Sequence, residues 1–129
     1  MAKINGIYKC EICGNIVSVI EGGDGALVCC GEEMKLFEEK RSGEGMEKHL
    51  PVISGESNKV IVKVGSAEHP MEESHYIQLI QLLNSKGIIA EKRLMPGEKP
   101  EAEFIVKDRE NIIARALCNV HGLWATEQI

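Results

Sequence analysis

This sequence has no long hydrophobic run, few aromatic residues and no excess of basic charge. No apolar stretch comes near the length needed to cross a membrane, so we expect no membrane association. Aspartate and glutamate number 20 against 15 lysines and arginines, which gives a formal net charge of −5. Because no basic stripe is available to neutralise phosphates, general nucleic-acid binding is excluded. The apolar fraction of 43% is typical of a soluble globular protein, although aromatic residues make up only 4%.

The opening segment, MAKINGIYKC, also lacks the apolar core of a signal peptide. The cysteines number 5, an odd count, and two of them form a Cys-x-x-Cys pair. Without a signal peptide, such a pair favours reduced thiolates on a metal over disulfides. We therefore expect a cytoplasmic protein.

At 129 residues the chain can form one ordinary domain, or one domain and a small module held by a metal. The region 1–38 predicts short strands at 6–9, 16–20 and 26–29, separated by glycine-rich turns. So small a piece buries little apolar surface, so a bound metal would supply much of its folding free energy. The charged, glycine-containing segment 39–45 predicts a linker, and 46–129 a second domain.

The second domain has the pattern of a β-protein. Val60, Val62 and Val64 alternate with their neighbours as in a strand with one polar edge. The apolar residues of 76–83 fit a helix about as well as a strand, and the neighbouring segments favour the strand. Short β-branched runs follow, at 87–94, 102–107 and 111–117. Several short strands at regular spacing predict an antiparallel β-sandwich of immunoglobulin-like type.

A first metal site is indicated by Cys10, Cys13, Cys29 and Cys30. Two thiolates on one tight turn bind a single ion, and Gly14 lets backbone N–H groups turn toward the sulfurs. Four thiolates suit tetrahedral iron or zinc, and the adjacent pair predicts a distorted tetrahedron. A plain zinc site is as compatible with the spacing as iron. A disulfide between the adjacent cysteines is less favoured, because it would leave the Cys-x-x-Cys pair without its partners.

The remaining cysteine and all the histidines indicate a second site, made of His49, His69, His75, Cys118 and His121. Any one of these histidines alone would more often be a surface or core residue than a ligand. Together they are too many for a structural zinc site, which closes at four ligands. They suit five-coordinate iron with nitrogens in a plane and sulfur on the axis. The sixth position, opposite an electron-donating thiolate, would then be open to a small oxygen species.

These motifs, in this order, resemble the desulfoferrodoxins, which are two-iron superoxide reductases. The resemblance spans nearly the whole chain: YKCEICGN and LVCCGEEMKL resemble the desulforedoxin-like N-terminal module, and EKHLPVI, VGSAEHPMEESHYI and LCNVHGLW the catalytic domain. It implies a small FeCys4 domain followed by an immunoglobulin-like, seven-stranded antiparallel β-sandwich, usually in a homodimer. It also implies a square-pyramidal iron with axial Cys118, bound by His121 through Nδ1 and by the other histidines through Nε2.

The implied reaction is the one-electron reduction of superoxide to hydrogen peroxide without release of dioxygen. Rubredoxin or a similar carrier would re-reduce the iron. Glu47 matches the glutamate that ligates the oxidised iron when substrate is absent. Lys48 matches the lysine beside the open position, where an ammonium attracts an anion and helps to orient water for proton transfer. Backbone N–H groups of Asn119 and Val120 are expected to donate to the axial sulfur.

Two other functions are compatible with parts of the sequence. A non-enzymatic electron carrier would use the four-cysteine centre and treat the second site as a structural metal. A zinc-binding interaction module would use neither iron nor an open coordination position. The number of ligands at the second site disfavours both the carrier and the zinc module.

Glu47 and Lys48 also have a simpler interpretation, as an ordinary pair of solvated side chains without a catalytic role.

Overall fold

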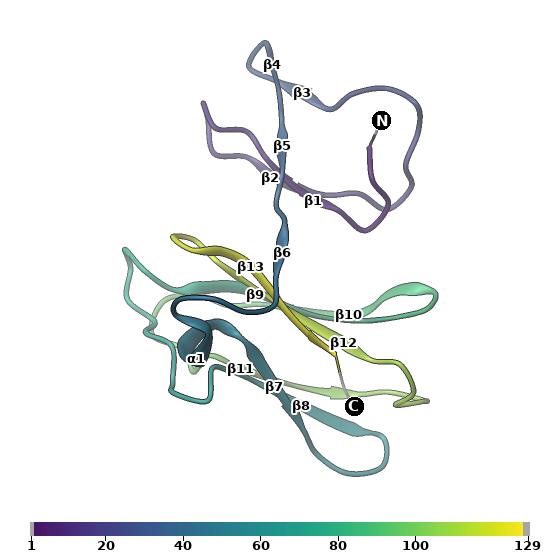
Figure 1. Ribbon diagram of the computed structural model, residues 1–129, viewed down its shortest axis with the longest axis vertical. Coiled ribbons are helices and arrows are strands. Elements are labelled where there is room, and N and C mark those ends of the chain that lie inside the picture. Colours follow the sequence, from purple (N-terminus) through teal and green to yellow (C-terminus); the bar gives the residue numbers. More distant parts are fainter. Residues whose placement is uncertain (1, 128–129) are drawn as a thin grey trace. The chain divides into compact units, whose positions relative to one another are not determined.

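The computed structural model describes residues 2–127 and divides the chain into two compact units, Met1–Glu38 and Glu39–Ile129. Both units consist mainly of β-strands (Figure 1). The predicted mainly-β class is therefore confirmed. Within the described residues, no helix is long and apolar enough to span a bilayer.

The first unit is built from two small sheets and very little core. A three-stranded sheet has the order β2-β1-β5, and a two-stranded sheet pairs β3 with β4. Among residues 2–38, its buried apolar cluster contains Ala2, Tyr8 and Val19, with Leu27 and Met34 packed against it. A core of this size stabilises a fold weakly, which agrees with the expectation that a metal holds the unit together. The strands are β1 (Ile7–Lys9), β2 (Ile16–Ser18), β3 (Val28–Cys29), β4 (Glu32–Glu33) and β5 (Lys35–Leu36).

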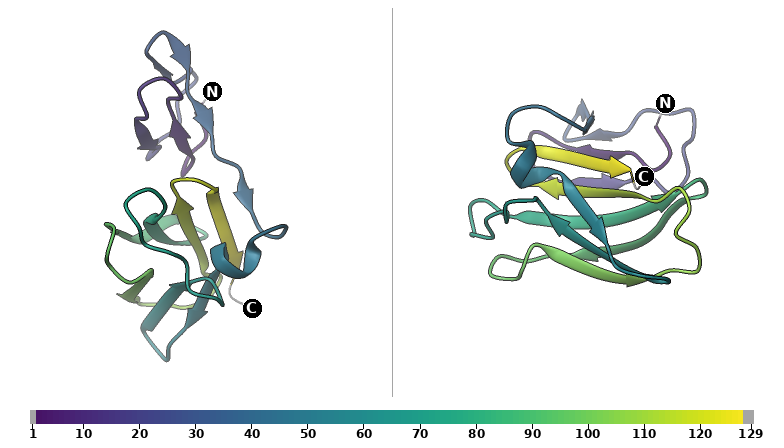
Figure 2. Two further views of the ribbon diagram at one scale, coloured as in Figure 1. Left: turned by 90° about the vertical axis from the view of Figure 1, so that its left-hand side faces the viewer. Right: turned by 60° about the horizontal axis from the view of Figure 1, so that its bottom comes forward.

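The second unit is a sandwich of two sheets, visible as two layers in Figure 2. The larger sheet has the order β10-β9-β12-β13-β6 and the smaller has the order β11-β8-β7. Neighbouring strands are antiparallel except for β6, which pairs in parallel with β13. The bounds are β6 (Glu39–Lys40), β7 (Pro51–Ser54), β8 (Lys59–Val64), β9 (Ile77–Asn84), β10 (Gly87–Arg93), β11 (Glu101–Ile105), β12 (Ile113–Cys118) and β13 (Gly122–Glu127).

The core of the second unit lies between the two sheets. Every second residue of β8 points inward, so that Val60, Val62 and Val64 are at most 1% exposed. From the opposite sheet, Ile80 and Ala116 pack against them, and the same cluster includes the thiol of Cys118 at the end of β12. The alternation predicted for 60–64 is thus the inner face of a sandwich strand, and the ambiguous segment 76–83 is the central strand β9.

The sequence pattern did not reveal every element: β4, β5, β7 and β13 were not predicted, and neither were two elements near the second group of ligands. Residues 46–49, expected to begin a strand-like region, form the one-turn helix α1 (Met46–His49). It starts after Gly45, whose φ of 83° is in the left-handed region, and ends before Pro51. The first two residues of the predicted linker, Glu39 and Lys40, form β6 at the edge of the larger sheet.

Helix α1 is tied to the loop that follows β8 by backbone hydrogen bonds. The N–H of Ala67 donates to the carbonyl of Glu47 at 2.8 Å, and the N–H of Gly65 donates to that of Leu50 at 3.1 Å. Gly65 has a φ of 88°, and a Cβ there would meet the carbonyl of Ala67 and, at 2.7 Å, that of Lys48. Only glycine fits this close approach of two backbones.

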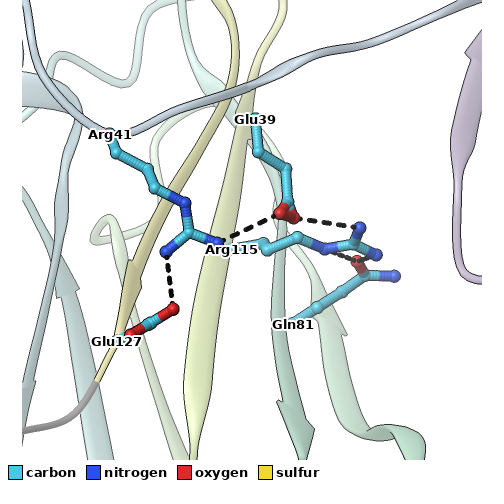
Figure 3. Close-up of polar contacts among 5 residues, drawn as sticks. All are labelled: Glu39, Arg41, Gln81, Arg115 and Glu127. Carbon is cyan, nitrogen blue, oxygen red and sulfur yellow. Dashed lines mark hydrogen bonds and ion pairs between the residues drawn. The ribbon is translucent and has the colours of Figure 1, made fainter.

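A polar network crosses the outer face of the larger sheet (Figure 3). The buried guanidinium of Arg115 donates twice to Oε1 of Gln81, from Nε at 3.1 Å and from Nη2 at 2.6 Å. On its other side it lies 3.8 Å from a carboxylate oxygen of Glu39, which also pairs with Arg41 at 3.4 Å. Arg41 in turn reaches Glu127 at 3.2 Å. Burial lowers the pKa of Arg115 while the carboxylate of Glu39 opposes this, so the cation is retained and fastens β6 to β12.

We predict that Gly65→Ala destabilises the second unit by about 2–3 kcal/mol, since it adds a backbone clash to the strain of a positive φ. The matched control is Gly97→Ala, because Gly97 has a similar φ of 91° and a Cβ there would meet nothing within 4 Å. The control should lose only about 1 kcal/mol. Urea unfolding of both variants measures the difference, and equal losses would contradict the role given to the close approach.

Candidate metal centres

The four cysteines of the first unit come together from two turns. Cys10 follows β1 directly, and Cys13 comes one turn later, where the N–H of Gly14 donates to the carbonyl of Cys10 at 2.9 Å. Cys29 ends β3, and Cys30 has a φ of 53°, a left-handed conformation unusual for a residue with a side chain. The sulfurs of this adjacent pair lie 4.0 Å apart, close enough to bind the same ion.

The spacing of the four sulfurs fits one tetrahedral metal. Their positions all lie within 4.8 Å of one another. The sulfur of Cys29 lies 3.5 Å from that of Cys13 and 4.0 Å from that of Cys30. Metal–sulfur bonds of about 2.3 Å in a tetrahedron would separate the sulfurs by about 3.8 Å. All four cysteines are free thiols, so the alternative of a disulfide between the adjacent pair is not what the structure contains.

The hydrogen bonds around these sulfurs prepare them unequally for metal binding. The backbone N–H of Cys13 lowers the pKa of Cys10 to about 7, as expected for a turn that directs amide groups at a thiolate. The hydrogen bond with the Cys13 thiol raises the pKa of Cys30 to about 12, and the same partner raises that of Cys29. Four thiols this close cannot all ionise unaided, whereas a bound cation would favour ionisation of every one.

The second group of ligands gathers at one end of the sandwich. Strand register places Pro51 opposite Val64 in the smaller sheet, and Cys118 opposite both Ile77 and Gly122 in the larger. The segments that precede or follow these residues therefore meet at the same end. They carry all five candidate ligands: His49 on α1, His69 and His75 between β8 and β9, and Cys118 and His121 at the turn between β12 and β13.

The four imidazole rings form a closed circuit. Neighbouring ring centroids are 4.8 Å apart for His49 and His69, 4.7 Å for His69 and His75, 5.0 Å for His75 and His121, and 4.8 Å for His121 and His49. Each of these pairs is edge-on, with interplanar angles of 67° to 80°. His49 and His75 face each other across the circuit at 6.4 Å. This is the arrangement of four ligands at the corners of a square.

The distances between ring nitrogens agree with that geometry. Nε2 of His49 lies 3.1 Å from Nδ1 of His121 and 3.3 Å from Nε2 of His69. Metal–nitrogen bonds of about 2.1 Å would put adjacent corners of a square about 3.0 Å apart. The donor atoms of His49, His75, Cys118 and His121 all lie within 4.8 Å of one another, and His69 joins them through His49.

Backbone carbonyls set the tautomers of two of the rings. Nδ1 of His49 lies 2.8 Å from the carbonyl of Gly45, and Nδ1 of His69 lies 2.6 Å from that of Pro70. A ring that donates its Nδ1–H to a carbonyl keeps a lone pair on Nε2 for a metal. The Nε2 atom of His75 is buried and, among the described residues, has no hydrogen-bond partner. A buried nitrogen left in this way is costly unless an ion takes the lone pair.

Burial keeps the imidazoles in the form that binds metals. Desolvation lowers the pKa of His69 to about 4 and also lowers that of His49. Because a lowered pKa favours the uncharged ring, both side chains are neutral at pH 7 and carry a free lone pair. These two rings are therefore ready to act as ligands, without the repulsion that a pair of imidazolium ions would have.

The sulfur of Cys118 is buried beneath this circuit, at 1% exposure, and lies 3.9 Å from Nδ1 of His121. The N–H of His121 donates to it at 3.4 Å. The donor is thus His121 and not Asn119 or Val120, the residues that the sequence predicts. Asn119 instead donates its N–H to the carbonyl of Tyr76, because the bulge between Leu117 and Cys118 turns it toward β9.

The side chain of Asn119 has a structural role that the sequence analysis missed. Its Oδ1 accepts the N–H of Tyr76 at 2.9 Å, and its Nδ2 donates to the carbonyl of Ser74 at 3.2 Å. The amide thus clamps the residues on both sides of His75 to the turn that carries Cys118. An asparagine in a tight turn, able to bond backbone groups with both ends of its amide, was the available signal.

The structure brings all nine candidate ligands into two groups but leaves Glu47 and Lys48 in solvent. Both side chains are exposed. Glu47 lines a shallow groove with Leu50, Ser66 and Thr126. Among residues 2–127, neither side chain makes a hydrogen bond or an ion pair. Their helical turn is nevertheless fixed, because the carbonyl of Glu47 accepts the N–H of Ala67 and the hydroxyl of Ser66.

The donor sets decide which metals fit. Four thiolates at tetrahedral spacing suit iron or zinc, whereas a square of four imidazoles with a fifth, sulfur ligand exceeds what a closed zinc site holds. The unpartnered Nε2 of His75 and the carbonyl-directed tautomers point to a resident ion at the second group. Both groups fit iron.

Known proteins carry the same two-part organisation. Residues 41–127 match the desulfoferrodoxin family model, and residues 2–37 match the model of the desulfoferrodoxin N-terminal domain. The chain is 54% identical over 124 residues to a desulfoferrodoxin homolog of Archaeoglobus fulgidus, covering 96% of this chain and 98% of that one. It is 51% identical over 121 residues to a desulfoferrodoxin of Nitratidesulfovibrio vulgaris, covering 94% of each.

A solved structure agrees over the same length. The superoxide reductase from Treponema pallidum superposes with a TM-score of 0.75 at 27% identity, covering 98% of this chain and 99% of that one. The two family models together, the two relatives and this structure all span both units of the chain. On these grounds the chain belongs to the desulfoferrodoxin family.

Proposed function

We propose that the chain is a superoxide reductase, and the circuit of four imidazoles above a buried thiol carries this proposal. Superoxide takes up one electron and two protons at this centre and leaves as hydrogen peroxide, without release of dioxygen. Iron held by the four histidines and Cys118 would supply the electron and an open coordination position for the substrate. The likeness to a superoxide reductase over almost the full length of both chains supports the same reaction.

The burial of the ligands favours access from the side opposite the sulfur. Cys118 lies in the core at 1% exposure and His49 is buried at 5%, whereas His121 is exposed. The imidazole circuit therefore lies between the core and the surface, and a small anion can reach it without passing through the sandwich. The burial of Cys118 in an apolar environment favours electron donation from its sulfur to a bound metal.

Lys48 supplies the positive charge that this surface needs. The chain has a net charge of −5, which repels superoxide, and an exposed ammonium next to His49 creates a local attraction. The same ammonium can hold a water molecule that delivers a proton to the reduced oxygen. We assign to Glu47 the task of closing the open position of the oxidised centre when substrate is absent.

The two units have separate tasks in this proposal. Residues 1–38 form the FeCys4 domain, 39–45 connect it, and 46–129 carry the catalytic centre. The ligands are Cys10, Cys13, Cys29 and Cys30 in the first domain and His49, His69, His75, Cys118 and His121 in the second. The exposed thiols of Cys13 and Cys30 would give an electron carrier direct access to the first metal.

The partners follow from the chemistry. A rubredoxin-like carrier would return the electron, because each turnover consumes one and neither centre stores more than one. We propose a homodimer and a cytoplasmic location, the latter because the five cysteines are free thiols that gather with the histidines in two metal-binding groups. A pure electron carrier is the alternative function, but it does not explain why five ligands surround the second centre.

The test of the reaction is anaerobic. Fully reduced protein is mixed with superoxide, and the visible spectrum and any dioxygen are followed together. We expect a sulfur-to-iron charge-transfer band and stoichiometric peroxide, with no dioxygen; Cys118→Ser should lack the band. Release of dioxygen would indicate dismutation instead, and an unchanged spectrum would favour the carrier.

Lys48→Ile should slow the bimolecular reaction with superoxide by about tenfold at low ionic strength, because the local attraction for the anion is lost. The dependence of the rate on salt should weaken as well. Stopped-flow measurements between low and high salt give both quantities. Lys92→Ile, which removes an exposed lysine of β10, an edge strand of the larger sheet, is the control. A rate equal to that of the control would remove Lys48 from the mechanism.

Glu47→Ala should change the ferric visible spectrum at neutral pH while the reaction with superoxide stays fast, since the carboxylate acts only when substrate is absent. Glu44→Ala removes an exposed carboxylate three residues earlier and should leave the spectrum unchanged. Identical ferric spectra in wild type and Glu47→Ala would show that this carboxylate is not a ligand.

A further inference from the structure

The backbone carbonyl of His121 is held by two side chains outside the ligand set. Lys40 donates to it from Nζ at 2.9 Å, and Trp124 donates from Nε1 at 3.2 Å. The ring of this same residue presents Nδ1 to the centre, 3.1 Å from Nε2 of His49. These hydrogen bonds restrict rotation of the backbone on the C-terminal side of His121. On the N-terminal side, the N–H of His121 is fixed by its hydrogen bond to the sulfur of Cys118.

Lys40 reaches this carbonyl because β6 is held by both its backbone and its side chains. Its backbone pairs in parallel with β13, where Lys40 lies opposite Trp124. Its neighbour Glu39 projects to the other side of the strand, as alternation requires, and meets Arg115 and Arg41 in the network of Figure 3. The ammonium lies 5.4 Å from the centroid of the Trp124 ring, within the range of a cation–π interaction. Although exposed, this ammonium has two partners, the carbonyl and the indole ring, that fix its position.

Trp124 extends the contact to a second ligand. Its ring stacks on that of His49, with centroids 4.9 Å apart and an interplanar angle of 21°. Lys40 therefore contacts the Trp124 ring, which in turn stacks on His49. Lys40 and Trp124 also both donate hydrogen bonds to the carbonyl of His121. The two histidines are adjacent corners of the imidazole square. One cation is therefore linked to half of the equatorial ligands.

We propose that Lys40 is a positioning residue of the histidine centre, which orients His121 and, by its charge, favours the ferrous over the ferric state. This inference rests on the proposed iron centre and adds a residue outside both its ligands and the Glu47–Lys48 pair. A positive charge near a metal opposes the further charge that oxidation creates, so it raises the reduction potential. Solvent screens an exposed ammonium, which keeps the effect modest.

The experiment is a redox titration of the holoprotein, in the absence of superoxide, following the sulfur-to-iron band that is lost in Cys118→Ser. Lys40→Met keeps the length of the side chain but removes charge and donor. We expect it to change the ferric-to-ferrous ratio at a fixed potential about threefold toward ferric, or about 30 mV for a one-electron couple. The shift should shrink at high salt, and the band should move because His121 is less constrained.

Two further variants make the test decisive. Lys40→Arg keeps charge and donors and should restore the potential and the band position. Lys92→Met makes the same substitution at an exposed lysine of β10, across the sheet from β6. If Lys40→Met matches Lys92→Met, or if Lys40→Arg is as altered as Lys40→Met, the proposal is wrong. Because potential and spectrum are measured without superoxide, this result is independent of whether the chain reduces superoxide.

Discussion

The convergence of four imidazoles and one thiol on a single point is the constraint on which the second unit depends. Nitrogen atoms 3.1 Å and 3.3 Å apart must be held without charge, because protonated rings at these distances would repel one another. Burial provides this for His49 and His69, and backbone carbonyls select the tautomer. The sheets contribute by register, since pairing of Cys118 with both Ile77 and Gly122 brings the ligand-bearing turns together.

The two metal sites differ in what they contribute to the stability of their units. In the first unit the metal site takes the place of a core, since its main cluster has three buried residues in the part of the chain that the structure describes. In the second unit the core exists independently, and Cys118 is one of its members. Loss of metal should therefore unfold the first unit, whereas it should leave the sandwich standing with an unsatisfied nitrogen on His75.

Residue type and strand period predicted the ligands and the sandwich because both are local properties. Alternation at 60–64 is sufficient to define an inner face, and cysteine and histidine have few other reasons to occur together. Residue type and strand period could not predict contacts between segments that are distant in the sequence. The clamp formed by Asn119 needs the register of β12 against β9, and Lys40 acquires its partner only through a two-residue parallel pairing that no pattern reveals. Helix α1 is a single turn, too short for periodicity to show.

The position of the ligands along the chain has a consequence for how the protein is made. The four cysteines run from Cys10 to Cys30, so their cluster can close around a metal while the rest of the chain is still on the ribosome. The histidine centre must wait for Cys118 and His121, because His49, His69 and His75 adjoin one another earlier in the chain but lack both the sulfur and the fourth ring. Synthesis of the chain thus completes the ligand set of the first site before that of the second.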